Sequence, residues 1–432
     1  MHEGRLEREG VGLHYLEWRP AGPPREPSLL LLHGLSSNAR IWERMAALLP
    51  GRRIVALDQR SHGLSDRPDS GHTLDDVTAD AAHAIRELGL GRPLVVGHSW
   101  GAAVALALAS AQPELAGGLV VVDGGTSSFS RFMTWEDAAA RMQPPLPTYR
   151  DAEEAAAARA ADLEQAWADD LMAFVRAGLV EVPTEGFTST LTAAARLEIL
   201  RDLYDFQPEL LFAEVQGPIL LAMAGQTWPG APPEFAERRR RSAEEVLELR
   251  PDAQLRWYDS RHDVPLIRPA ELAADVERTA IATAFRAVAR DAGALAANPA
   301  LDWRRPAHGD GDGWDARQLL AHLSSTQAAL PAIIAASPPP PQGDGAGGDG
   351  RPAFDPNRWN ESQQRRRAER RPSELAYELV RGAEGVHAAL MDADLAAETG
   401  LGRFAGLPLG EGMEAMLRHQ RAHLADLGSA LS

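Results

Sequence analysis

Ser99 lies in the pentapeptide GHSWG, a G-x-S-x-G pattern over residues 97–101. An apolar run at 93–96 precedes this pattern and a helical run at 102–111 follows it. A sharp turn from a strand into a helix needs small residues on both sides of the serine, and it holds the hydroxyl clear of the backbone. The pattern therefore predicts a nucleophilic serine that forms a covalent intermediate.

A serine hydroxyl is a weak nucleophile until a base accepts its proton, so a histidine must follow later in the chain. His262 is the one of the 13 histidines that position selects. It comes directly after the apolar run at 255–258 and before a helical pattern. We expect His262 to be the base for Ser99.

Acyl transfer also needs two backbone N–H donors that bind the oxyanion. Trp100, the residue after the nucleophile, would supply one of them. Leu35 would supply the other, because it follows His33 and Gly34 at the end of the apolar run at 28–32. The glycine allows the loop to turn tightly, and the side chain of His33 is interpreted as structural.

Short apolar runs in the first part of the chain read as buried strands. Helical patterns at 74–88 and 102–111 lie between several of these runs, which predicts an α/β domain with a mostly parallel sheet. The runs lie at residues 28–32, 53–57, 93–96, 118–122, 218–223 and 255–258.

Between about residues 126 and 215 the strand pattern stops, and the sequence is rich in Ala, Glu, Asp and Leu at helical spacing. This segment is predicted to be an inserted helical cap. An insertion after the carboxyl end of a strand would cover the ligand crevice of an open α/β sheet and shape a pocket for a small-molecule substrate. The alternative is a helical decoration that does not touch substrate.

Residues 12–280 resemble the α/β-hydrolase superfamily. The resemblance includes the GHSWG and HGLSS segments, the RHDVPLIRP context of His262, and the stretch from Asp58 to Asp66, DQRSHGLSD, which is similar to a D-x-R-G-x-G-x-S loop of that family. It implies hydrolysis through an acyl-enzyme, with no cofactor, of an ester, thioester, lactone or carbon–carbon bond. Asp58 and Asp66 are interpreted as residues that brace this loop.

The sequence departs from the family pattern at the acid of the triad. Many members carry an aspartate shortly after the strand that corresponds to 218–223, but this chain has AGQTWP there. Some relatives carry the acid after the preceding strand, where this chain has Asp123, and we assign Asp123 the task of orienting His262. The alternative is that Asp123 only caps a turn, which would leave Ser99 and His262 as a weakened dyad.

The last part of the chain is helical in character and predicts a second, all-α domain. Four Ala-rich helical patterns lie at 271–297, 315–336, 373–391 and 411–431, as expected of a four-helix bundle. We place the domains at 1–282 and 283–432. The stretch 337–352, which contains SPPPPQGDGAGGDG, is expected to be a mobile loop because its Pro and Gly content prevents a helix.

Three histidines of this bundle could bind a divalent metal. His322 falls on the apolar face of its helix, and His419 and His423 are four residues apart, so they project from one side of another helix. Each of them alone is more often a structural histidine, and His387 is a possible substitute ligand.

The helical segment resembles the DinB-type four-helix bundles, including the N-terminal domain of mycothiol-dependent maleylpyruvate isomerases. The matching features are GWDARQLLAHL around His322 and the terminal H-x-x-x-H-L. The resemblance implies a zinc or nickel ion on His322, His419 and His423, with open positions for water or a low-molecular-weight thiol. Such an ion would assist hydrolysis or thiol transfer.

Composition excludes several classes of protein. The net charge of −17 argues against binding to nucleic acid or to an anionic membrane surface. The absence of cysteine excludes disulfides, thiolate metal ligands and a cysteine nucleophile. The first ten residues lack the apolar core of a signal peptide, so a cytoplasmic protein is expected, and the oligomeric state stays open.

Three functions are compatible with these patterns. The leading one is a serine hydrolase that uses Ser99, His262 and Asp123. The second is a metal- and thiol-dependent transferase or isomerase centred on the bundle. The third is a binding or scaffold protein with a decayed triad, against which the intact serine, histidine and oxyanion-loop residues argue.

Overall fold

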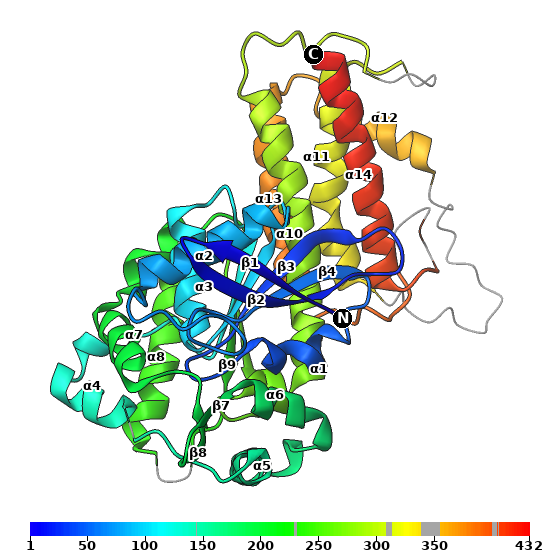
Figure 1. Cartoon of the computed structure of the whole chain (residues 1–432). Helices are drawn as coiled ribbons and strands as arrows, with labels where there is room; N and C mark the ends of the chain where they lie inside the picture. The colour runs from blue at the N-terminus through cyan, green and yellow to red at the C-terminus, as the bar shows by residue number, and fades with distance from the viewer. Residues whose placement is uncertain (144, 229–230, 308–312, 338–354, 400–403, 405) are drawn as a thin grey trace. The chain divides into compact units, whose positions relative to one another are not determined.

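An eight-stranded sheet organises the first of the two units into which the chain divides, Met1–Ala280 and Ile281–Ser432. The computed structural model describes residues 1–432 except 144, 229–230, 308–312, 338–354, 400–403 and 405 (Figure 1). The predicted loop at 337–352 lies, apart from Ser337, outside the described residues.

The order of the strands is β1-β2-β4-β3-β5-β6-β9-β10. The six from β4 to β10 in this order are parallel, and β2 pairs antiparallel with both β1 and β4. The bounds are β1 (His2–Arg8), β2 (Val11–Trp18), β3 (Arg25–Leu32), β4 (Arg52–Leu57), β5 (Leu94–His98), β6 (Gly118–Val122), β9 (Ile219–Ala224) and β10 (Gln254–Tyr258). All six predicted strands are present, which confirms the α/β fold class.

The central strands are buried on both faces. Leu29, Leu30, Leu31 and Leu32 of β3 point alternately to the two faces, and all four are inaccessible to solvent. The helices α2 (Leu74–Glu87), α3 (Trp100–Ala111) and α8 (Pro233–Leu249) pack into the same core as Leu30 and Leu32. A sheet covered in this way positions loops at the carboxyl ends of its parallel strands.

Strands β1 and β2 were not predicted. Their sequences, HEGRLER and VGLHYLEW, contain no continuous apolar run, because β1 is an edge strand with alternating exposure and β2 buries polar His14 and Glu17. Glu17 is held by Arg53 of β4 at 2.8 Å. A buried strand can therefore contain charged residues that form ion pairs across the sheet, and such a strand lacks the apolar run by which strands are recognised in a sequence.

The segment 126–215 is mostly helical, but it also contains two short strands that the sequence did not predict. Strands β7 (Leu179–Val182) and β8 (Gly186–Ser189) form an antiparallel pair, too short and too polar to be recognised as apolar runs. The cap helices are α4 (Trp135–Met142), α5 (Ala152–Leu163), α6 (Met172–Ala177) and α7 (Ala193–Asp205). Figure 1 shows α4, α5 and the β7–β8 pair beyond one end of the sheet.

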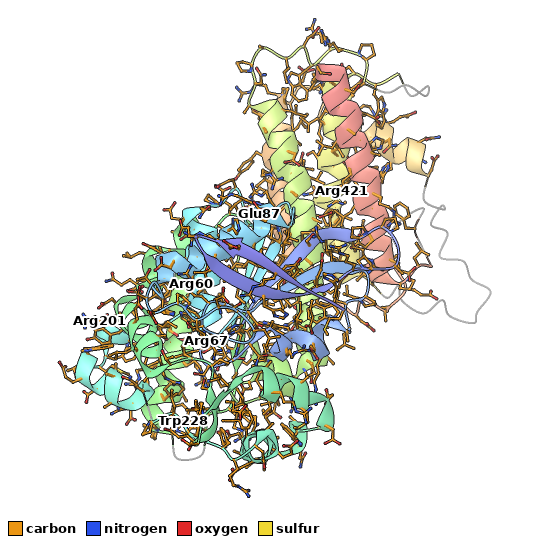
Figure 2. The ribbon with its side chains drawn as sticks, viewed as in Figure 1. Arg60, Arg67, Glu87, Arg201, Trp228 and Arg421 are labelled. Atoms are coloured by element: carbon orange, nitrogen blue, oxygen red, sulfur yellow. The ribbon has the colours of Figure 1, made fainter. Side chains whose placement is uncertain are left out.

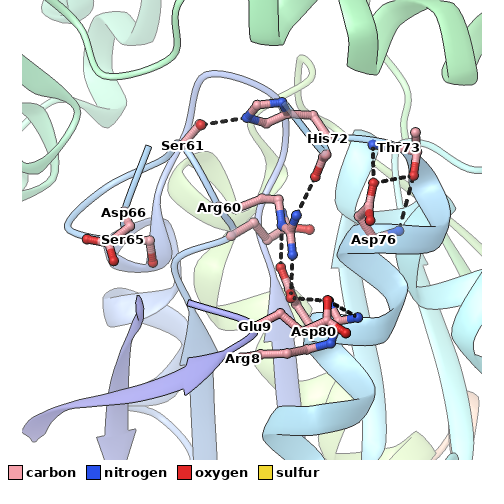
Figure 3. Close-up of polar contacts among 12 residues, drawn as sticks. Arg8, Glu9, Arg60, Ser61, Ser65, Asp66, His72, Thr73, Asp76 and Asp80 are labelled. Atoms are coloured by element: carbon pink, nitrogen blue, oxygen red, sulfur yellow. Dashed lines mark hydrogen bonds and ion pairs between the residues drawn. The ribbon is translucent and has the colours of Figure 1, made fainter. Parts of the chain in front are cut away.

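The loop after β4 is fixed by polar contacts. Asp58 accepts hydrogen bonds from the amides of Ala39 (2.6 Å) and Leu64 (3.0 Å), and Asp66 accepts one from the Gly12 amide (2.7 Å). Arg60 reaches across to the carboxylate of Asp80 on α2, with N–O distances of 2.6 and 2.8 Å (Figure 3). These contacts agree with the interpretation of Asp58 and Asp66 as bracing residues.

The second unit is a helical bundle. It comprises the carboxyl-terminal part of α10 (Pro269–Ala296), with α11 (Ala316–Ala335), α12 (Pro356–Arg366), α13 (Pro372–Met391) and α14 (Leu409–Leu431). The four predicted helices are present, and α12 was missed because PNRWNESQQRR offers almost no apolar residues. Helices α11 and α13 pack so closely that a Cβ at Gly382 would lie 2.9 Å from the Ala328 amide nitrogen. Within the described residues, no helix combines the length and hydropathy that a bilayer span requires.

Candidate active site

Ser99 occupies a strained turn between β5 and α3. Its backbone is left-handed, with φ 54° and ψ −120°. The turn is possible only because its neighbours lack side chains: a Cβ at Gly97 would lie 2.1 Å from the Gly101 carbonyl oxygen, and a Cβ at Gly101 would lie 2.4 Å from that of Leu32. A strained residue held by its surroundings is a common feature of functional sites.

Ser99, His262 and Asp123 form one continuous hydrogen-bonded chain, although 163 positions separate Ser99 from His262. His262 Nε2 lies 2.9 Å from Ser99 Oγ, and His262 Nδ1 lies 2.7 Å from Asp123 Oδ2. His262 follows β10, and Asp123 follows β6. With the proton on Nδ1, the imidazole donates to the carboxylate and accepts from the hydroxyl, as a general base requires.

Asp123 is held in place from several directions. Its carboxylate accepts a hydrogen bond from the Ala224 amide at 3.1 Å and forms an ion pair with Arg239 of α8 at 3.2 Å. Burial by itself raises the pKa of Asp123, but the hydrogen bond and charge of His262, with Arg239 and the amide, hold it below its usual value. Asp123 is therefore an anion at neutral pH.

The carboxylate changes the basicity of His262 in turn. Desolvation in the cavity lowers the pKa of His262, but the hydrogen bond that its Nδ1–H donates to Asp123 and the negative charge of that carboxylate outweigh this, so that the pKa is raised above its ordinary value. The positive charge of Arg239 acts in the opposite direction and lowers it. His262 is thus set as a stronger base than a free imidazole.

His98 and Arg239 contact this hydrogen-bonded series of residues, and neither was assigned a role from the sequence. The Nε2–H of His98 donates to the backbone carbonyl of His262 at 2.9 Å, and the two rings lie 4.8 Å apart. Burial, followed by the charge of His262, lowers the pKa of His98 to about 4, so its ring is neutral at pH 7. The position of His98 inside GHSWG could have indicated a role at the site, whereas Arg239 lies in a run of arginines with no recognisable motif.

Of the two predicted oxyanion donors, Trp100 follows Ser99 directly and Leu35 follows Gly34, which approaches Ser99. Trp100 is the first residue of α3, and the first amides of a helix have no acceptor within the helix. Gly34 brings the loop of Leu35 close to Ser99, since a Cβ at Gly34 would lie 2.9 Å from Ser99 Cβ. His33 is buried, with Nδ1 at 2.8 Å from the Gly34 carbonyl and Nε2 at 3.1 Å from the Gln59 amide nitrogen, as its structural interpretation expects.

A cavity of about 670 Å³ opens over Ser99 and His262. Its walls come from the cap and from α8, and they are largely aromatic and aliphatic, with Phe129, Phe132, Leu203, Phe206 and Phe235 among the lining residues. Trp228, which is labelled in Figure 2, also lines the cavity and is 49% exposed. The cap therefore lines the site, and the volume is that of a pocket for a small organic molecule.

His322, His419 and His423 of the second unit also come together. One nitrogen of each ring lies within 4.8 Å of one nitrogen of the other two, and the Nε2 atoms of His322 and His419 are 3.4 Å apart. Tetrahedral zinc with Zn–N bonds of about 2.0–2.1 Å would separate its nitrogens by about 3.3 Å, so the spacing of His322 and His419 matches two ligands of such an ion. His387 is buried on α13 and does not belong to this group.

Comparison with known proteins agrees with the fold of the first unit. The alpha/beta hydrolase family model matches residues 29–276. Lipase LipV of Mycobacterium tuberculosis is 31% identical over 273 residues, which cover 61% of this chain and 96% of the lipase. The 2-(acetamidomethylene)succinate hydrolase of Mesorhizobium japonicum is 39% identical over 98 residues, which cover 22% of this chain and 35% of that relative.

Solved structures show the same fold. The crystal structure of E-2-(acetamidomethylene)succinate hydrolase is 23% identical, with a TM-score of 0.53, and the match covers 64% of this chain and 98% of that one. A thioesterase domain from the curacin biosynthetic pathway is 21% identical, with a TM-score of 0.52, and the match covers 63% and 98% of the two chains. Because the family model covers more than half of the residues and LipV aligns over nearly its whole length, the chain belongs to the alpha/beta hydrolase family.

Proposed function

We propose that the first unit is a serine hydrolase that cleaves an ester, thioester, lactone or carbon–carbon bond of a small substrate. The observation that carries this proposal is the unbroken hydrogen-bonded chain from Ser99 through His262 to Asp123, with distances of 2.9 and 2.7 Å, at a cavity wall. A dyad without a carboxylate is the less favoured arrangement, because Asp123 is buried and ion-paired as well as bonded to His262.

Each residue has one task in the proposed reaction. Ser99 Oγ attacks the carbonyl carbon of the substrate while His262 Nε2 takes the hydroxyl proton, and the amides of Trp100 and Leu35 bind the oxyanion. The tetrahedral intermediate collapses to an acyl-enzyme as His262 gives its proton to the leaving group. Water then attacks the acyl-enzyme with His262 again as the base, which releases the acid and restores Ser99.

The names of two relatives support this reaction class. LipV is called a lipase and the Mesorhizobium relative a hydrolase, and both descriptions fit cleavage of a bond to a carbonyl carbon. We therefore place the substrate among acyl compounds. The apolar walls of the cavity favour a small, partly apolar molecule.

A fluorophosphonate probe tests the assignment of the nucleophile. We expect covalent labelling of Ser99, located by peptide mass spectrometry, and no labelling of Ser99→Ala. Ser110→Ala, at the far end of the same helix α3, is the matched control and should label as fast as the unaltered protein. Absence of a Ser99 adduct on folded, unaltered protein would contradict the proposal and favour a scaffold with a decayed triad.

A second candidate function concerns the helical unit, and the clustering of His322, His419 and His423 favours it. We propose that this unit is a DinB-like bundle that binds zinc or nickel and acts as a metal- and thiol-dependent transferase or isomerase. When bound to three neutral imidazoles, such an ion keeps its full charge and lowers the pKa of a bound water or thiol. The three histidines would hold the ion, and the rings of Trp314 and Trp359 lie beside His322, with ring centres 5.1 and 6.5 Å away.

Metal analysis of the full-length protein tests this second function. We expect one zinc or nickel per chain after incubation with the ion and removal of the excess, and none in His322→Ala/His419→Ala. A bundle that takes up no metal under these conditions would overturn the proposal, and the thiol-dependent activity would go with it.

A further inference from the structure

The cavity over Ser99 carries an unusual charge for this protein. Four arginines line it, Arg141, Arg238, Arg239 and Arg261, and Asp123 is the one carboxylate among its lining residues in the described part of the chain. The chain as a whole has 61 acidic and 44 basic residues. The cavity therefore carries positive charge although the protein as a whole is negatively charged. This local positive charge attracts anions into the cavity.

Two of these arginines have tasks within the protein. Arg239 pairs with Asp123 at 3.2 Å and donates to the Gln226 carbonyl at 2.8 Å. Arg261 pairs with Glu164 at 3.2 Å and also donates to the Asp162 carbonyl. Asp123 itself is shared between Arg239 and His262. The single carboxylate of the cavity is thus already neutralised.

Arg238 and Arg141 differ from this pair. Within the described residues, neither forms an ion pair or a hydrogen bond with the protein. Arg238 lies with its guanidinium carbon 4.9 Å from the centre of the Phe132 ring, so the aromatic face supports the cation but leaves its N–H groups available. Phe132 lines the same cavity, and Arg141 comes to it from α4 of the cap.

We propose that Arg238, assisted by Arg141, binds a carboxylate of the substrate that is separate from the bond that Ser99 cleaves. The substrates would then be acyl compounds with a free carboxylate, such as the half-esters of short dicarboxylic acids. A planar guanidinium matches a carboxylate with two parallel hydrogen bonds, and partial removal from water strengthens such a pair. This inference rests on the proposed hydrolase function.

The rest of the lining agrees with this class of substrate. Phe129, Phe206 and Leu203 provide apolar walls for the carbon chain that joins the carboxylate to the reacting carbonyl. A carboxylate on a short carbon chain uses these walls and Arg238 together, whereas an inorganic phosphate has no carbon chain to place against them.

Matched pairs of esters test the proposal by kinetics. One pair compares the p-nitrophenyl monoester of adipic acid with p-nitrophenyl hexanoate, which places the carboxylate on the acyl side. The other compares 4-carboxyphenyl hexanoate with 4-carbamoylphenyl hexanoate, which places it on the leaving group. We expect kcat/KM for the anionic member of one pair to exceed that of its neutral partner by about tenfold to a hundredfold.

The preference should depend on the two arginines. In Arg238→Gln the ratio of anionic to neutral kcat/KM should fall to near one, and in Arg141→Gln it should fall by a smaller factor. Arg240→Gln is the matched control, since it removes the same charge from the same arginine run but does not line the cavity. A ratio of one or less in both pairs, or a ratio that survives in Arg238→Gln/Arg141→Gln, would overturn the proposal.

A binding measurement separates this inference from the hydrolase assignment. Calorimetric titration of Ser99→Ala with adipate should show saturable binding that Ser99→Ala/Arg238→Gln lacks, while adipamide should bind neither protein measurably. If no ester is hydrolysed but adipate binding depends on Arg238, the hydrolase proposal fails and the carboxylate site stands. If phosphate binds as well as adipate, or if Arg238→Gln leaves adipate binding intact, the carboxylate site fails.

Discussion

The two units each gather histidines, but they surround them with different partners. His262 lies between one hydroxyl and one carboxylate, with Asp123 at 2.7 Å. His322, His419 and His423 face one another, with ring centres 4.2 to 5.6 Å apart. A carboxylate stabilises a protonated imidazole, whereas neighbouring imidazoles oppose one another's protonation. The first arrangement favours proton transfer and the second favours three neutral ligands on a cation.

The two arrangements also differ in how the backbone positions the rings. His262 lies in a loop after β10, where His98 fixes its backbone carbonyl and Asp123 fixes its ring. His419 and His423 are one turn apart on α14, so the helix itself sets their spacing. A loop histidine that must move protons needs individual supports, while a pair of ligands can rely on helical geometry.

The largest expected effect distinguishes the two sites by activity. His262→Ala removes the proposed base, so kcat for an activated ester should fall by roughly 10⁶-fold, as in serine hydrolases that lose the base of a triad. Steady-state hydrolysis of p-nitrophenyl hexanoate measures this loss. His83→Ala, on α2 and outside the cavity lining, is the control. A His262→Ala protein that folds and retains most of its rate would remove the contrast between the two sites.

Asp123→Asn tests whether the carboxylate is what makes His262 different from the bundle histidines. An amide can support the wrong tautomer of the imidazole and cannot stabilise its protonated form, so we expect a loss of about 10⁴-fold in kcat. Circular dichroism should confirm that the variant is folded. A loss of less than about tenfold would favour a Ser99–His262 dyad and the interpretation of Asp123 as a turn cap.

The bundle site predicts a smaller effect, on metal affinity. Loss of an outer-shell partner of a metal site can weaken metal binding by roughly 100-fold. Loss of a direct ligand should weaken it at least as much, so we expect zinc to bind His419→Ala at least about 100-fold more weakly. Competition with a chromogenic chelator measures the affinity, and the gain in melting temperature with added zinc should disappear in parallel. His387→Gln is the comparison variant. If it weakens zinc binding as much as His419→Ala does, His387 is a ligand after all.

Local patterns in the sequence were enough to predict parts of both sites. The turn at Ser99 is determined by the short segment from Gly97 to Gly101, and the helical spacing of His419 and His423 needs no tertiary information. Asp123 can reach His262 only because β6 and β9 are neighbours in the sheet. This pairing, in which Val122 lies opposite Ala222, is known from the structure and not from the sequence. Arg239 could not be predicted, because its contact with Asp123 depends on the packing of α8.

Elements without apolar periodicity could not be predicted from the sequence either. Strands β1, β2, β7 and β8 and helix α12 lack a continuous run or stripe, since polar side chains such as Glu17 are buried through ion pairs or the element is exposed. For the same reason, the place of Arg238 in the cavity could not be predicted from the sequence. A cationic side chain in a cavity looks, in sequence, like any arginine of a solvated helix.

The smallest predicted effect is a shift in pH dependence, and its direction follows from the charges around His262. Hydrolysis needs neutral His262, and Asp123 raises its pKa above the ordinary value of 6.5, so the rate should increase with pH through a midpoint above 6.5. Arg239 lowers that pKa, because a nearby cation opposes protonation. In Arg239→Gln the pKa of His262 should rise, and the acidic limb of kcat/KM against pH should move to higher pH. Arg240→Gln should leave the limb in place. A shift to lower pH would show instead that Arg239 acts mainly by holding Asp123 in position, because a carboxylate displaced from His262 would no longer raise the pKa of that histidine.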